Sequence, residues 1–131
     1  MALENCELFF LKPQTFTEGR EYYATGAKHA PGEHGQKILM AYNPETGKRV
    51  WEYPQVGNGT SWGGTMTTAG GLVFFGNDSE AFEAVDARNG KPLWHFNTGQ
   101  AMHASPMSYA IGGKQYVAIA SGSDVFAFAL R

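Results

Sequence analysis

A pattern of eleven residues occurs twice in the chain, and it limits the possible folds more than any other feature. The segment from Ala41 to Trp51 reads AYNPETGKRVW, and the segment from Ala84 to Trp94 reads AVDARNGKPLW. The copies start 43 residues apart, and a further step of 43 residues reaches Ala127 in the run VFAFA. A period of roughly 40–45 residues is typical of β-propellers, in which each repeat forms one four-stranded blade.

Pairs of glycines repeat at nearly the same interval. Gly70 and Gly71 precede the run LVFF, and Gly112 and Gly113 precede the run KQYVAI, 42 residues further on. Glycine adopts positive φ angles at little cost, so each pair suits the tight turn of a β-hairpin. The two pairs therefore indicate that equivalent hairpins recur in successive blades.

Short runs of β-branched and aromatic residues predict strands along most of the chain. The 17 glycines and six prolines leave little room for helices. We expect an all-β fold, a partial β-propeller of about two and a half four-stranded blades, with blade repeats near residues 1–55, 60–98 and 103–131. The expected strands are Leu3–Phe10, Lys37–Tyr42, Arg49–Tyr53, Gly63–Thr68, Leu72–Gly76, Ala81–Val85, Pro92–Phe96, Ser105–Ala110, Gln115–Ala120 and Val125–Leu130.

With blade strands named A to D from the propeller centre outward, these runs supply strands B to D of one blade, a complete second blade, and strands A to C of a third. The polar stretch from Lys12 to Gln36 is rich in glycine, and we expect it to be a surface excursion without strands. The first and last blades would then expose unpaired sheet edges and apolar faces.

Composition and charge exclude several partners. The net charge of −2 provides no basic surface for nucleic acid or for an anionic membrane. No run approaches the ~18 apolar residues of a membrane span. The N-terminal stretch carries Glu4 and Glu7 without a basic region, so the sequence shows no signal peptide.

The repeated pattern has a structural explanation. Asn43 or Asp86 can accept backbone N–H groups in a tight turn, and a glycine supplies the left-handed residue. The tryptophan that ends each copy can pack between adjacent blades, although an exposed tryptophan could also be a stacking platform. We assign the structural role to Ala41, Asn43, Thr46, Gly47 and Trp51 in the first copy, and to Ala84, Asp86, Gly90 and Trp94 in the second.

On these residues the sequence resembles the pyrroloquinoline quinone (PQQ) dependent alcohol dehydrogenases of the methanol and ethanol dehydrogenase family. The family carries a tryptophan-docking motif, A-x-D-x-x-T-G-K-x-x-W. The chain matches it twice, with Asn43 in place of Asp in the first copy and Asn89 in place of Thr in the second. The stretch from Trp62 to Gly76 is similar to the segment in which the family places a PQQ-lining tryptophan, and Gly113 to Gly122 is similar to the end of the family sequence.

The resemblance implies an eight-bladed propeller of roughly 340 residues plus insertions. It also implies PQQ and Ca²⁺ on the propeller axis, and the oxidation of a primary alcohol with an Asp as the base. The quinone of the family stacks between a tryptophan and a pair of adjacent cysteines, whereas this chain has the single Cys6. The family's base and calcium ligands lie in earlier blades, so we expect a C-terminal fragment that is inactive and binds no cofactor alone.

The resemblance assigns Trp62 to the cofactor site, and Gly63 and Gly64 would let the backbone approach a planar ligand. A packed surface tryptophan and a simple strand start are the alternatives for these three residues. We expect no catalytic residue and no metal site in the chain, because its histidine pairs lack a third ligand. Asp78 and Glu80 are interpreted as part of a polar hairpin turn.

Two functional hypotheses follow. In the first, the chain supplies the terminal blades of a PQQ-dependent alcohol dehydrogenase, in the periplasm by resemblance. In the second, it is a non-catalytic quinoprotein-like propeller used as a scaffold or binding module. In either case the expected partners are the remaining propeller blades or further copies of the chain, which would associate through the exposed blade edges.

Overall fold

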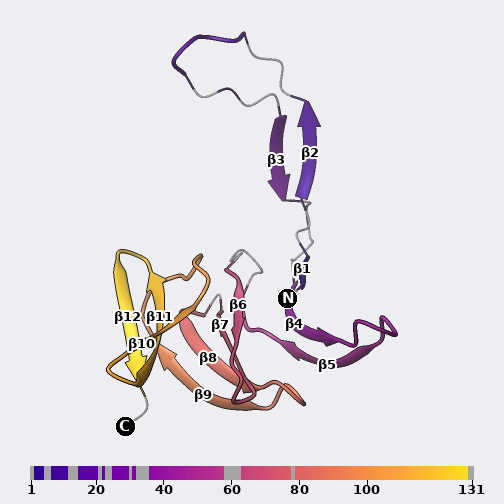
Figure 1. Cartoon of the computed structure of the whole chain (residues 1–131). Coiled ribbons are helices and arrows are strands. Elements are labelled where there is room, and N and C mark those ends of the chain that lie inside the picture. Colours follow the sequence, from indigo (N-terminus) through magenta and orange to yellow (C-terminus); the bar gives the residue numbers. More distant parts are fainter. Residues whose placement is uncertain are drawn as a thin grey trace.

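The chain folds entirely into β-structure over the part that can be described, and it forms twelve strands there (Figure 1). No helix capable of crossing a membrane occurs within that part. The predicted all-β fold class is therefore confirmed. The residues described by the computed structural model are 2–4, 7–11, 15–20, 22, 25–29, 31, 36–57, 63–77 and 79–129.

The strands are close to those expected from the sequence between residues 36 and 129, where the ends differ by a few residues at most. They are β1 (Ala2–Glu4), β2 (Glu7–Leu11), β3 (Thr25–His29), β4 (Gln36–Tyr42), β5 (Arg49–Pro54), β6 (Thr65–Thr67), β7 (Leu72–Gly76), β8 (Ala81–Asp86), β9 (Pro92–Asn97), β10 (Met107–Ile111), β11 (Lys114–Ser121) and β12 (Asp124–Ala129).

Three antiparallel sheets follow one another in space, and a separate hairpin extends away from them (Figure 1). Sheet 1 has the order β1-β4-β5, sheet 2 the order β6-β7-β8-β9, and sheet 3 the order β10-β11-β12. Within the described residues, sheet 2 alone has four strands, in chain order, as expected of a complete blade. Strands β2 and β3 pair with each other to form the hairpin.

The beginning of the chain differs from the prediction. The sequence predicts a single strand over Leu3–Phe10, whereas the structure has two, and only β1 joins sheet 1. The stretch from Lys12 to Gln36 contains β3, although it is predicted to lack strands. The sequence of β3, TGAKH, has little intrinsic strand preference, so its strand conformation depends on pairing with β2, which no local pattern reveals.

Two hydrophobic clusters fill the spaces between the sheets. Between sheets 1 and 2 the buried residues are Leu39, Val73, Phe75 and Val85. Between sheets 2 and 3 they are Phe82, Met102, Val117 and Ile119. Sheet 2 is therefore covered on both faces, which explains why four consecutive residues of β8 are buried.

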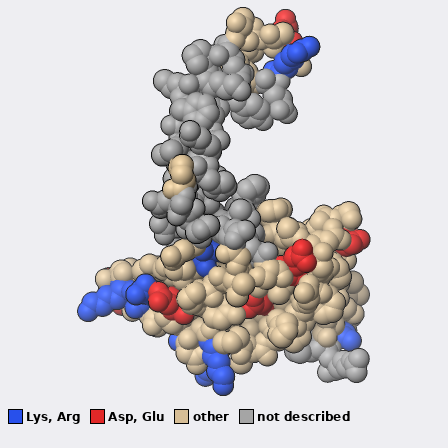
Figure 2. All heavy atoms as spheres, turned by 180° about the vertical axis from the view of Figure 1, so that it is seen from behind, with Lys and Arg blue, Asp and Glu red and all other residues tan. Residues whose placement is uncertain are grey.

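Charged side chains are scattered over the face drawn in Figure 2. The blue lysines and arginines and the red acidic residues lie in small separate groups between wide areas of other residues. No extended surface of one sign is visible among the described residues on this face.

Candidate functional site

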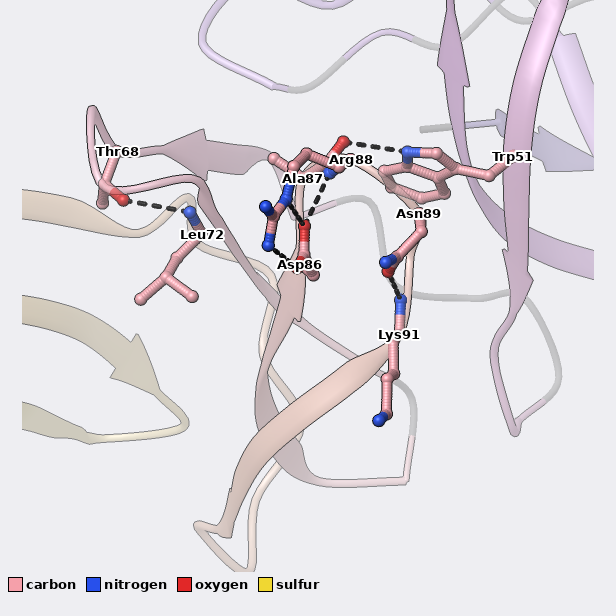
Figure 3. A network of polar contacts seen from close by, with 8 residues as sticks. All are labelled: Trp51, Thr68, Leu72, Asp86, Ala87, Arg88, Asn89 and Lys91. Atoms are coloured by element: carbon pink, nitrogen blue, oxygen red, sulfur yellow. Dashed lines mark hydrogen bonds and ion pairs between the residues drawn. The ribbon is translucent and has the colours of Figure 1, made fainter.

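The second repeated turn is closed by its own backbone and side chains. The N–H of Gly90 donates to the carbonyl of Asp86 at 2.8 Å, and the N–H of Asp86 donates to the carbonyl of Lys91 at 2.9 Å. Gly90 has a φ angle of 71°, the left-handed conformation that favours glycine. The Asp86 carboxylate accepts the N–H of Arg88 at 2.8 Å, as Figure 3 shows.

The first repeated turn has the same backbone geometry. The N–H of Gly47 donates to the carbonyl of Asn43 at 2.9 Å, and Gly47 has a φ angle of 66°. The side-chain oxygen of Asn43 accepts the N–H groups of Glu45 and Thr46, at 2.9 and 3.1 Å. Asn43 therefore performs the hydrogen-bonding role of an aspartate in this turn, without the charge.

The charge of Asp86 is stabilised by a neighbouring arginine. The Arg88 side chain donates to both carboxylate oxygens of Asp86, at 3.0 and 2.7 Å (Figure 3). These hydrogen bonds from Arg88, first from its side chain and then from its backbone, lower the pKa of Asp86 to about 2.

Trp51 connects sheet 1 to the second turn. Its indole N–H donates to the carbonyl of Ala87 at 2.9 Å (Figure 3). A β-carbon on Gly90 would lie 2.6 Å from the Cε3 atom of the Trp51 ring, which is closer than real β-carbons approach. Gly90 is therefore required for two reasons, its positive φ angle and the space that the indole occupies.

Trp94, the equivalent residue in the second copy, has different surroundings. Its ring packs edge-to-face against Phe82 and Phe128, at centroid distances of 5.9 and 5.1 Å, and stacks on Phe96. It is 38% exposed, and a turn 43 residues after that of Asp86 would begin at residue 129, where the described residues end. It borders a groove of about 670 Å³ between sheets 2 and 3, lined also by Leu72, Phe74, Val117 and Phe128.

Of the three residues that the resemblance assigns to the cofactor site, Trp62 lies outside the described residues. Gly63 and Gly64 are described, and both approach the segment before β10. A β-carbon on Gly63 would lie 2.8 Å from the carbonyl oxygen of Ala104, and the N–H of Gly64 donates to the Ser105 hydroxyl at 3.1 Å. Both glycines therefore allow close contact with another segment of the same chain, the one that precedes β10.

A buried polar cluster lies between sheets 1 and 2, and the sequence analysis did not identify it. The carboxylate of Glu83, which is 8% exposed, accepts the Tyr53 hydroxyl at 2.8 Å and also the side-chain amide of Asn77. Burial, followed by the hydrogen bond to Glu83 and its negative charge, raises the pKa of Tyr53 to about 12. The one available signal is the acidic residue inside the otherwise apolar run AFEAV.

A buried lysine lies near this cluster in the fold. Lys37 is 3% exposed, and its ammonium group donates to the carbonyl of Gly76 at 3.1 Å, across the boundary between sheets 1 and 2. Since both oxygens of Glu83 already accept hydrogen bonds, the cluster satisfies its own polar groups. It can hold sheets 1 and 2 in register, but it does not present a free base.

The turn between β7 and β8 is organised by Asn77. Its side-chain oxygen accepts the N–H groups of Ser79 and Ala81, both at 2.9 Å. Glu80 has a φ angle of 64°, and its carbonyl accepts the N–H and the hydroxyl of Thr98, at 2.8 and 3.0 Å. Asp78, which we interpreted together with Glu80 as a polar turn, lies outside the described residues.

The described residues do not form a site for a metal ion. No group of three or more His, Cys, Asp or Glu side chains comes together in that part of the chain. The calcium ion that the family resemblance implies therefore does not fit the residues described, and we derive no reaction step through it.

Comparison with known proteins agrees with the resemblance noted in the sequence. Residues 54–117 match the family of the glucose, ethanol and alcohol dehydrogenase β-propeller domain, PQQ. The chain is 39% identical over 118 residues to the quinoprotein alcohol dehydrogenase PedE of Pseudomonas putida, covering 88% of the chain. It is 38% identical over 111 residues to a lanthanide-dependent methanol dehydrogenase of Methylorubrum extorquens, covering 82%. It spans only 18% of the length of each of these relatives.

The fold comparison leads to the same family. The structure of a europium-containing methanol dehydrogenase superposes with a TM-score of 0.73 and 31% identity, over 92% of the chain and 21% of that protein. The predicted fold, a portion of a quinoprotein β-propeller, is thereby confirmed. The chain has the sequence and fold of a PQQ propeller domain, and over most of its length it is homologous to the quinoprotein alcohol and methanol dehydrogenases.

Proposed function

We propose that the chain supplies terminal blades to the propeller of a PQQ-dependent enzyme that oxidises alcohols. The observation that carries this proposal is the similarity over 92% of the chain to a methanol dehydrogenase structure, in sequence and fold together. On the family resemblance, the compartment of this enzyme is the periplasm. A bound PQQ would accept the two electrons that leave the alcohol.

The part of the chain assigned to the cofactor is the segment around Trp62. The Trp62 ring would form one wall of the quinone site, since a flat indole offers a large stacking surface to a planar cofactor. The role of Gly63 and Gly64 would be to hold this segment close to Ala104 and Ser105, whose contacts fix the backbone directly after Trp62.

The base and the metal ligands would come from other blades. We therefore expect the isolated chain to be inactive as an alcohol dehydrogenase. Calcium is the metal that the family resemblance implies, whereas two similar proteins are named for lanthanides. The PQQ titration described below therefore tests calcium and a lanthanide ion separately.

A non-catalytic scaffold is the second candidate. The observation that favours it is that the approach allowed by Gly63 and Gly64 is made to the chain's own Ala104 and Ser105. Packing alone then explains both glycines, and no planar ligand is needed to account for them.

A PQQ titration of the full chain separates the two candidates. Tryptophan fluorescence is followed with Ca²⁺ and, separately, with La³⁺, and is corrected with free N-acetyltryptophanamide for absorption by PQQ. The matched variants are Trp62→Phe and Trp94→Phe, which remove one indole each. Saturable quenching that Trp62→Phe abolishes and Trp94→Phe retains would mean that the chain keeps one wall of the quinone site, which supports the alcohol dehydrogenase proposal. Absence of saturable quenching in every chain would mean that cofactor binding depends on blades other than these, and that this chain contributes structure alone.

A further inference from the structure

Sheet 3 has an apolar face that points away from sheet 2. Side chains alternate between the faces of a strand, and Val117 and Phe128 occupy the covered face. The residues that alternate with these along the strands point to the opposite face, away from sheet 2. They form rows across β10, β11 and β12, in which Tyr109 lies opposite Tyr116 and Tyr116 lies opposite Ala129. We call this surface the β10–β12 outer face; it consists of Met107, Tyr109, Ile111, Lys114, Tyr116, Ala118, Val125, Ala127 and Ala129.

The β10–β12 outer face is apolar except for Lys114 at the start of β11, whose ammonium group lies over the Tyr116 ring, 6.0 Å from its centroid. The Tyr109 and Tyr116 rings stack with their centroids 5.1 Å apart and their planes 8° apart. Met107 is 58% exposed and Val125 is 76% exposed. Stacked tyrosines beside exposed aliphatic side chains are the composition expected of the centre of a protein interface.

Sheet 1 has a second, largely apolar face at the opposite end of the row of sheets, and no described residue of sheets 2 and 3 packs against it. Leu39 and Trp51 pack toward sheet 2, so the residues that alternate with them point away from it. Tyr42 is 56% exposed and Val50 is 59% exposed. We call this surface the β4–β5 outer face; it consists of Ile38, Met40, Tyr42 and Val50, together with Glu52, which lies opposite Met40 and forms an ion pair with Arg49 at 2.6 Å.

The 43-residue repeat shows what these positions do when a neighbouring sheet is present. Val85 lies 43 residues after Tyr42, and it is fully buried against sheet 1. Phe82 lies 43 residues before Val125, and it is fully buried against sheet 3. Equivalent positions are thus exposed at both ends of the row and buried in its middle.

We propose that, when the chain is present without the other blades of the proposed enzyme, a second copy covers these faces, with the β10–β12 outer face of one copy packed on the β4–β5 outer face of the next. The contact would continue the packing already made twice inside each copy, between sheets 1 and 2 and between sheets 2 and 3. It joins two different surfaces, so it is a head-to-tail contact that forms a ring if the rotation closes.

The proposal concerns sheet faces and not sheet edges. Strand β12 is the last strand of sheet 3, and an added strand could also pair with its free backbone groups. Such pairing would depend on the backbone of β12, whereas face packing depends on the exposed side chains. Substitutions on the two faces therefore distinguish these modes.

The test uses the full chain and two lysine substitutions, Val50→Lys and Val125→Lys, one on each face. Both positions are more than half exposed, so a lysine is compatible with the fold, which circular dichroism verifies. Val56→Lys is the matched control, because Val56 is 74% exposed but follows β5 and belongs to neither face. Sedimentation equilibrium measures the mass of each chain alone and of the two variants mixed in equal amounts.

The proposal expects the unmodified chain and Val56→Lys to associate, and each face variant to sediment at the monomer mass of 14.3 kDa. Each variant should associate at least about 100-fold more weakly, because a buried unpaired lysine is costly at an interface. The mixture should recover a dimer, since each variant retains the face that the other lacks. An unmodified chain that is monomeric, association that survives both substitutions, or a mixture without dimer would each overturn the proposal.

Discussion

The indole of Trp51 and the carbonyl of Ala87 are joined by a hydrogen bond of 2.9 Å between residues 36 positions apart in the chain. This bond attaches strand β5 of sheet 1 to the turn that follows β8 in sheet 2. The contact is anchored on both sides, because the same turn presents Gly90 to the indole ring. It gives a direct means of measuring how strongly two neighbouring sheets depend on each other.

Trp51→Phe should lower the free energy of unfolding by about 1–3 kcal/mol, since it leaves the Ala87 carbonyl without its partner and reduces the packing. Trp94→Phe should cost roughly 1 kcal/mol or less, because Trp94 is partly exposed and makes no equivalent contact with a turn in the described part of the chain. Urea unfolding followed by circular dichroism, at one fixed protein concentration, compares the two. Equal losses would contradict the different surroundings of the two indoles.

Gly90→Ala and Gly47→Ala form a matched pair. Both glycines have positive φ angles, of 71° and 66°, so each alanine should cost about 1–2 kcal/mol of backbone strain. Only at Gly90 would the new methyl group meet the Trp51 ring, which should add about 1–3 kcal/mol. The same urea measurement should place Gly90→Ala well below Gly47→Ala in stability, and the difference should shrink in a Trp51→Ala background.

The bond between Tyr53 and Glu83 should make stability depend on alkaline pH. The folded state raises the pKa of Tyr53 from about 10 to about 12, so folding favours the protonated phenol. Its stabilising contribution should be complete below pH 10 and lost as the pH rises through 12. Tyr53→Phe should therefore be less stable than the unmodified chain at pH 8 in urea unfolding, and this difference should narrow between pH 10 and 12.

The pair formed by Asp86 and Arg88 should be visible in the titration of the carboxylate. The folded-state pKa of Asp86, about 2, lies below its usual value, so the pair contributes at pH values above about 4 and is lost as the pH falls toward 2. Arg88→Ala should raise the pKa of Asp86, measured by carboxyl ¹³C NMR. Arg49→Ala, which removes the partner of Glu52 in β5, should leave the Asp86 titration unchanged.

The sequence predicts sheets 2 and 3 and the two repeated turns well, because each depends on residues close together in the chain. The Asp86 turn is an example, since its glycine, its acceptor side chain and its tryptophan each have an equivalent residue 43 positions earlier, in the first copy of the pattern. The pairing of β2 with β3 could not be predicted in this way, because the partners are separated by the long polar excursion.

The repeat does not predict the contacts of equivalent residues when the two copies have different neighbours. Trp51 and Trp94 match in sequence, but only Trp51 reaches a turn in the described structure. The polar cluster around Glu83 was missed for a related reason. A period-two pattern identifies which residues share a face, but it does not reveal that Tyr53 and Asn77 will be close enough to satisfy a buried carboxylate.

The pairing of β1 with β4 also has a consequence for how such a chain can be altered. Leu3 lies opposite Lys37 and Glu4 lies opposite Gln36, so the 31 residues between Glu4 and Gln36 leave and re-enter sheet 1 at neighbouring positions. A two-residue type I′ turn such as Asn-Gly could replace this excursion without changing the register of sheet 1. The segment that carries the β2–β3 hairpin could thus be removed as a unit, and another segment could be inserted between Glu4 and Gln36 in its place.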